Sequence, residues 1–211
     1  MRYAAFLRNV NLGRPGSPTR AQLEAAFLDA GAREAASFQV NGTLVFTPGP
    51  GTRPRALAAR ACELMRASCG MREPVFVRSV AELRALVASE PFFEMRVSGL
   101  ESCASGASAK GELGTRNFQD LTPASICCCI TFLAAPRKPL PPLPIVTPRG
   151  DLELLRSDDT HVLSVSRWVG KSGGSPNAWL ERQLGEPATT RNWRTVVRLV
   201  EKYGREEGIF C

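Results

Sequence analysis

A cluster of polar residues follows the first apolar run of the sequence and has the side chains that recognise an anion. Its members are Arg8, Asn11 and Gly13. Guanidinium and amide N–H groups donate hydrogen bonds to anionic oxygens, and loops that leave strands often hold ligands. Because a tight turn also needs asparagine and glycine, a turn without a ligand is the alternative interpretation. We group Asn41 and Gly42 with this cluster as candidate ligand-binding residues.

A second polar cluster, Thr190, Arg191 and Asn192, opens the last helix that the sequence predicts. A helix N-terminus offers free N–H groups and positive potential, so a threonine hydroxyl and an arginine there suit an anion. Simple N-capping by Thr190 or Asn192 explains the same residues. Spacing alone favours capping, and anion binding stays the functional hypothesis.

The same predicted helix carries a basic stripe. At about 100° per residue its basic side chains fall within one narrow sector, and apolar side chains lie around the opposite side. Such a stripe could neutralise the phosphates of a nucleotide or a nucleic acid. Charged faces on surface helices are routine, so a solvated face is the favoured interpretation. The stripe consists of Arg191, Arg194, Arg198, Lys202 and Arg205.

The G-x-S-x-G motif at residues 170–174 is typical of a hydrolase nucleophile, here Ser172. The single histidine, His161, precedes the serine, whereas an α/β-hydrolase places its histidine last. A flexible turn is therefore the favoured interpretation. A hydrolase-type enzyme that acts at Ser172, or on phosphate esters at Thr190, is kept as the alternative.

Residue types give little support to metal or cofactor chemistry. One histidine with Asp158 and Asp159 nearby does not complete a usual zinc site, and the seven cysteines lack paired C-x-x-C spacing. The consecutive residues 127–129 would alternate between the two faces of a strand, so the three thiols could not share one metal. We predict no metal and no cofactor, with the cysteines reduced in a cytoplasmic protein.

Composition describes an ordinary globular protein with a positive charge. The 211 residues include 27 basic and 20 acidic side chains, a net charge of +7. Because 23 of the basic residues are arginine, a bias that a GC-rich genome also produces, bulk charge alone does not identify a nucleic-acid partner. The most apolar stretch, residues 126–135, has about half the length that a membrane helix needs. We therefore expect no membrane partner.

The first ninety residues predict a β-α-β-β-α-β order followed by one more helix. Asn-Gly between two apolar runs is the strongest short-range signal of a hairpin, and this order is the split βαβ pattern of ferredoxin-like domains. The predicted strands are 3–7, 35–40, 43–47 and 74–78. The predicted helices are one that Ser17 or Thr19 caps and Gly31 ends, followed by 55–69 and 80–88.

The rest of the chain predicts a looser repeat of three strands and two helices. We divide the sequence into a first subdomain at 1–97, a flexible Ser/Gly-rich loop at 98–125, and a second α+β subdomain at 126–211. Six prolines within 136–148 indicate an extended connection. The predicted strands are 126–133, 152–155 and 161–165, and the helices are 176–184 and an amphipathic C-terminal helix that starts at Thr190.

Motifs spread over the chain carry a family resemblance: Tyr3-x-x-x-Leu7-Arg8-x-x-Asn11-x-Gly13, Ser37-Phe38 with Asn41-Gly42 and Val45-Phe46, Pro74-Val-Phe-Val-Arg78 with Ala81-Glu82-Leu83 and Pro91-Phe92, Thr131-Phe132-Leu133, and Asn177, Leu180, Glu181 and Leu184-Gly185 with Ala188-Thr-Thr-Arg-Asn-Trp-Arg-Thr-Val196. These segments resemble the bacterial domain of unknown function 1697 family. The resemblance implies an α+β fold of two ferredoxin-like subdomains, the second degenerate, and it implies no activity. The sequence departs from the family at Asn9 and Arg14, where glycine is usual.

Three functional hypotheses follow. The leading one is an α+β protein that binds an anionic ligand, either a nucleotide or a nucleic acid, through the two polar clusters. The alternatives are the hydrolase-type enzyme and a scaffold or oligomer subunit without a small ligand.

Overall fold

The computed structural model describes residues 1–92, 126–134 and 139–204. The chain forms two compact units, Met1–Ala88 with Val196–Cys211 and Ser89–Thr195. The C-terminal helix, predicted to belong wholly to the second subdomain, is divided in the structure, which groups its residues from Val196 onward with the first unit. The predicted loop at 98–125 lies outside the described residues. Within the described ranges, no helix combines the length and the apolar character needed to cross a membrane.

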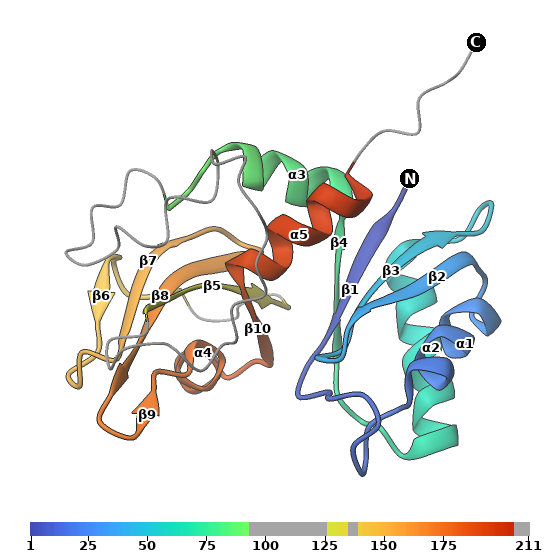
Figure 1. Cartoon of the computed structure of the whole chain (residues 1–211), viewed down its shortest axis with the longest axis horizontal. Coiled ribbons are helices and arrows are strands. Elements are labelled where there is room, and N and C mark those ends of the chain that lie inside the picture. Colours follow the sequence, from blue (N-terminus) through green and yellow to red (C-terminus); the bar gives the residue numbers. More distant parts are fainter. Residues whose placement is uncertain (93–125, 135–138, 205–211) are drawn as a thin grey trace, which may run out of the picture. The chain divides into compact units, whose positions relative to one another are not determined.

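The first unit contains a four-stranded antiparallel sheet in the order β2-β3-β1-β4 (Figure 1). Helices α1 and α2 provide the two crossovers, an order compatible with the predicted split βαβ pattern. The protein is of the α+β class, as predicted. The elements are β1 (Tyr3–Leu7), α1 (Arg20–Asp29), β2 (Ala32–Gln39), β3 (Thr43–Pro48), α2 (Pro54–Cys69), β4 (Val75–Ser79) and α3 (Val80–Ala88).

Local signals explain why these helices form where they do. Thr19 and Gln22 make a reciprocal capping box at the start of α1, and Gly70 ends α2 in the left-handed conformation. Both helices cover one face of the sheet, where the Phe27 and Phe46 rings pack with centroids 5.1 Å apart. The core of this unit therefore lies between the sheet and its two crossover helices.

The second unit contains a sheet in the order β10-β5-β8-β7-β6, with β9 paired to β8. Between β5 and β7 none of the described residues is helical. Helix α4 packs against an apolar area on one face of the sheet. The strand order is compatible with a degenerate repeat of the first unit. The elements are β5 (Ile126–Leu133), β6 (Ile145–Val146), β7 (Leu152–Ser157), β8 (His161–Val169), β9 (Ser172–Gly173), α4 (Pro176–Leu184) and β10 (Ala188–Asn192), and the last helix of the chain is α5 (Trp193–Tyr203).

The start of the last helix corrects the sequence analysis, which placed it at Thr190. Residues 188–192 instead form β10, which pairs antiparallel with β5 from Ala188↔Leu133 to Asn192↔Cys129. The two threonines in this segment are β-branched and suit a strand. Helix α5 begins at Trp193, because the Asn192 Oδ1 accepts the Arg194 N–H at 2.8 Å and so caps the helix.

Candidate functional site

The first polar cluster builds the loop between β1 and α1. Arg8 forms an ion pair with Glu73, with Nη1 and Oε2 2.6 Å apart. The Asn11 carbonyl accepts the Arg14 N–H at 3.1 Å, and Gly13 adopts a positive φ of +80°. These bonds favour the interpretation of the cluster as a turn, and its role in ligand binding stays a prediction.

Asn41 and Gly42 form the turn between β2 and β3, as the hairpin signal predicted. The Thr43 hydroxyl donates to Asn41 Oδ1 at 2.8 Å, and the Asn41 amide donates to Gln39 at 3.1 Å. Gly42 is buried with a φ of +71°, and its carbonyl accepts the Leu7 N–H at 2.9 Å. The side chain of Asn41 therefore organises its own turn.

The second polar cluster lies on β10, so its neighbouring side chains point to opposite faces of the sheet. Thr190 shares a 2.8 Å hydrogen bond with Thr131 on β5. Arg191 is on the other face, where its Nη1 donates to the Thr189 hydroxyl at 2.8 Å and to the Thr190 carbonyl at 2.9 Å. The cluster consequently does not form a single anion site at a helix N-terminus, and the cap that spacing favoured is made by Asn192.

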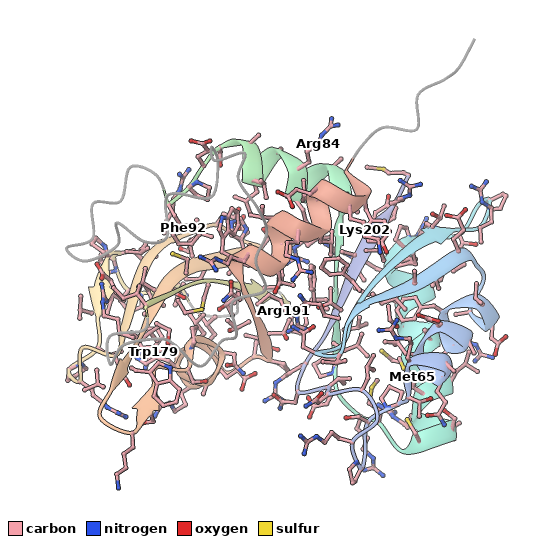
Figure 2. The ribbon with its side chains drawn as sticks, viewed as in Figure 1. Met65, Arg84, Phe92, Trp179, Arg191 and Lys202 are labelled. Atoms are coloured by element: carbon pink, nitrogen blue, oxygen red, sulfur yellow. The ribbon has the colours of Figure 1, made fainter. Side chains whose placement is uncertain are left out.

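The basic stripe is shorter than predicted. Arg191 precedes α5 and only 6% of it is exposed (Figure 2), so its expected place on an outward helix face is wrong. Burial lowers the pKa of Arg191 to about 10, which leaves the guanidinium charged at neutral pH. Arg194, Arg198 and Lys202 are exposed along α5, and Arg205 lies outside the described residues.

Ser172 does not have the surroundings of a hydrolase nucleophile. It sits in the β8–β9 hairpin opposite Val169, and its hydroxyl accepts a 2.7 Å hydrogen bond from Arg149. His161 occupies the other end of β8, eight residues from Val169, or about 26 Å at about 3.3 Å per residue. The histidine is therefore out of reach of the serine. At Thr190 the phosphate-ester hypothesis loses its premise, because a strand residue replaces the expected helix start.

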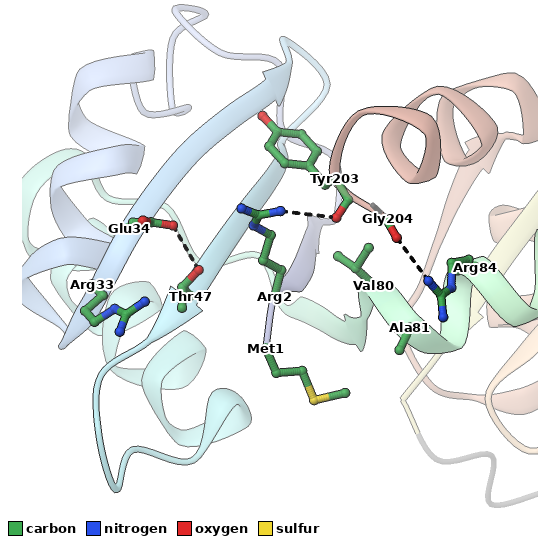
Figure 3. A pocket seen from close by; sticks show the side chains of 10 residues that line it. All are labelled: Met1, Arg2, Arg33, Glu34, Thr47, Val80, Ala81, Arg84, Tyr203 and Gly204. Atoms are coloured by element: carbon green, nitrogen blue, oxygen red, sulfur yellow. Dashed lines mark hydrogen bonds between the residues drawn. The ribbon is translucent and has the colours of Figure 1, made fainter. Parts of the chain in front are cut away.

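A pocket of about 430 Å³ in the first unit was not predicted from the sequence (Figure 3). Three arginines and one glutamate are among the residues that line it. The ten lining residues come from five different elements or segments. Their separation along the chain explains why no local motif signals the pocket. The lining residues are Met1, Arg2, Arg33, Glu34, Thr47, Val80, Ala81, Arg84, Tyr203 and Gly204.

Backbone carbonyls at the end of α5 hold two of the pocket arginines. Arg2 Nη1 donates to the Tyr203 carbonyl at 3.5 Å, and Arg84 Nη1 donates to the Gly204 carbonyl at 3.3 Å. Cationic side chains commonly bind the last carbonyls of a helix in this way. Glu34, the carboxylate of the pocket, accepts a hydrogen bond from the Thr47 hydroxyl at 3.1 Å. Arg33 is exposed.

A thiol cluster in the second unit was not predicted from the sequence. The Asn192 Nδ2, which was assigned to an anion site, donates instead to Cys127 Sγ at 3.1 Å. Cys127 in turn accepts a hydrogen bond from the Cys129 thiol at 3.6 Å. Among the residues that the structure describes, no three His, Cys, Asp or Glu side chains come together as a metal site would require.

The family described as Protein of unknown function (DUF1697) matches residues 1–113 of the chain. No curated protein matches the chain, and neither does any solved structure.

Proposed function

The chain belongs to the family described as Protein of unknown function (DUF1697), and because that description states no activity, we propose from its residues that the first unit binds an anionic small molecule of mononucleotide size. The observation that carries this proposal is the pocket of about 430 Å³ with three arginines and one carboxylate. Small-molecule sites commonly measure about 300–1,000 Å³. A concave site of this size favours a nucleotide over a nucleic acid.

The arginines of the pocket suit phosphate recognition. A guanidinium carries five N–H donors in a planar fork that matches the oxygens of a phosphate or carboxylate. The carbonyls of Tyr203 and Gly204 orient Arg2 and Arg84 through their Nη1 atoms. Each guanidinium is thereby held in place before a ligand arrives, which reduces the entropy lost on binding.

A smaller neighbouring pocket of about 230 Å³ supports a ligand that also has an apolar part. It shares Arg2 and Tyr203 with the larger pocket and adds the apolar side chains of Ala35, Val45 and Phe46. A nucleotide combines an anionic phosphate with a flat, weakly polar base. We therefore assign the phosphate to the arginine-lined pocket and the base to the smaller one.

We also propose that both units have ferredoxin-like topology and that the protein is cytoplasmic. Ferredoxin-like topology for both units is supported by the two strand orders. A cytoplasmic location is supported by the free thiols of the five cysteines in the described part of the chain, since thiols persist in reducing compartments.

Titration calorimetry with AMP, GMP and inorganic phosphate at low and high salt tests the proposed ligand. We expect Arg33→Ala to weaken AMP or GMP binding about tenfold, the loss of one charge-assisted contact. Arg55→Ala, on the exposed surface of α2 away from the pocket lining, makes the same change in net charge and should leave affinity unchanged. Equal losses in both variants, or no binding at low salt, would refute the proposed pocket.

A further inference from the structure

Cys127 and Cys129 place their sulfur atoms side by side on one face of β5. Residues two apart on a strand share a face, and the Cys129 thiol donates to Cys127 Sγ across 3.6 Å. Cys128 lies on the other face, in an apolar cluster with Val165. Cys127 is partly exposed and Cys129 is buried. Cys127 is therefore the more exposed residue of the pair, and the sulfur of Cys129 lies in contact with its own.

Neighbouring elements stabilise a negative charge on Cys127. Asn192 on β10 donates to its Sγ at 3.1 Å, and the Arg194 N–H fixes the orientation of that amide through Asn192 Oδ1. The hydrogen bond from Cys129 lowers the pKa of Cys127 from 9.0 to about 7; partial burial opposes this shift, and the charge of Arg194 adds to it. About half of Cys127 is then thiolate at pH 7, which is the nucleophilic form.

Strand β8 adds a hydroxyl to the same face. Ser164 pairs with Cys129 in the β5–β8 register, and in antiparallel strands such opposite residues share a face. Ser164 is fully buried, and its Oγ has no hydrogen-bond partner among the described residues. A buried hydroxyl normally has a partner, so Ser164 can donate to a thiolate or an oxygen formed at the cysteine pair. Ser166, opposite Cys127, donates to the Gly174 carbonyl at 2.7 Å.

We propose that Cys127 is a peroxide-reactive thiol and that Cys129 resolves its oxidised form. The Cys127 thiolate attacks one oxygen of hydrogen peroxide, an S–O bond forms, and the O–O bond breaks. The sulfur gives two electrons to the peroxide, whose other oxygen leaves as hydroxide. The Cys129 sulfur then attacks the sulfenic acid of Cys127, an S–S bond forms, and the S–O bond breaks. The oxygen leaves as water with the proton of the Cys129 thiol.

The strand allows this disulfide at the limit of its ordinary geometry. Two steps along an extended strand separate Cα atoms by about 6.8 Å, and disulfides usually span about 4.4–6.8 Å. The two Sγ atoms, now 3.6 Å apart, must approach to about 2.05 Å. We therefore expect a bond that forms with a small backbone adjustment and is readily reduced.

Site-resolved mass spectrometry tests both steps on the full chain with Cys103 and Cys211 replaced by serine. After hydrogen peroxide at pH 7 in the presence of dimedone, we expect a Cys127–Cys129 disulfide that a thiol reductant removes. With Cys129→Ser added, a dimedone adduct on Cys127 should replace it. Cys62 is the internal control, because burial raises its pKa to about 11 and keeps it protonated. Dimedone on Cys62 at the level of Cys127, or no oxidation of Cys127, would overturn the proposal.

The pH profile of iodoacetamide alkylation tests the surroundings of Cys127. A thiol of pKa 7 rather than 9 is about fiftyfold more ionised at pH 7, and its lower nucleophilicity offsets about tenfold of that gain. Cys127 should therefore react about fivefold faster than an unperturbed cysteine, with a midpoint near pH 7. Asn192→Leu should raise the midpoint, and Arg194→Ala, at an exposed position that should not disturb folding, should do the same. An unchanged midpoint in a folded variant would contradict the assigned contacts.

Discussion

Replacement of Gly42 by alanine is expected to lower the free energy of unfolding by about 2–4 kcal/mol. Gly42 has a φ of +71°, and an added Cβ would lie 2.8 Å from Val10 Cβ and 3.1 Å from Leu7 Cβ. Val10 and Leu7 are both buried, so neither side chain can move aside without disturbing the packed core. The cost combines the strained backbone with this overlap. Urea unfolding followed by circular dichroism measures it.

Gly16→Ala is the matched control for this variant. Its φ of +73° is nearly the same, and nothing lies within 4 Å of an added Cβ. We expect a loss of only about 1 kcal/mol, the backbone contribution alone. If the two variants lose equal stability, the overlap with Val10 and Leu7 is not what makes position 42 intolerant. A larger loss at Gly42 would mean that reduced ligand binding in Gly42→Ala reports on folding rather than on a lost ligand contact.

The first unit could be predicted from the sequence because its determinants are local. The Asn41-Gly42 pair selects the hairpin turn, Thr19 caps α1, and Gly70 ends α2. Each signal acts within a few residues of the structure that it specifies. Once these signals set the β-α-β-β-α-β order, short connections between the elements leave few ways to arrange the strands in one sheet.

The error at β10 has the opposite cause. Thr190 resembles a helix cap when only its neighbours in sequence are considered, and the amphipathic pattern continues into α5. The pairing of β10 with β5 joins segments about sixty residues apart, and that pairing determines the local structure. The same distance hid the thiol cluster, because Asn192 reaches Cys127 only in this register.

Arg191→Ala is expected to lower the free energy of unfolding by about 2–4 kcal/mol. The change removes the hydrogen bonds to the Thr189 hydroxyl and the Thr190 carbonyl. Bonds to a charged group contribute about 1.5–3 kcal/mol, and truncation of a buried side chain also leaves a cavity. Relief of the desolvation that lowers the pKa of Arg191 offsets part of these losses. Burial lowers the pKa of Arg191 only to about 10, so the guanidinium is charged across the neutral range. The loss of unfolding free energy should therefore be the same at pH 6 and at pH 8.

Arg198→Ala provides the comparison that separates folding from binding. Arg198 is exposed on α5. Its replacement by alanine removes the same charge and should change the free energy of unfolding by no more than about 0.5 kcal/mol. Since the proposed pocket lies in the first unit, loss of ligand binding in Arg198→Ala would indicate a contact made by the helix surface. A fully stable Arg191→Ala variant would show that the buried guanidinium is not needed for folding.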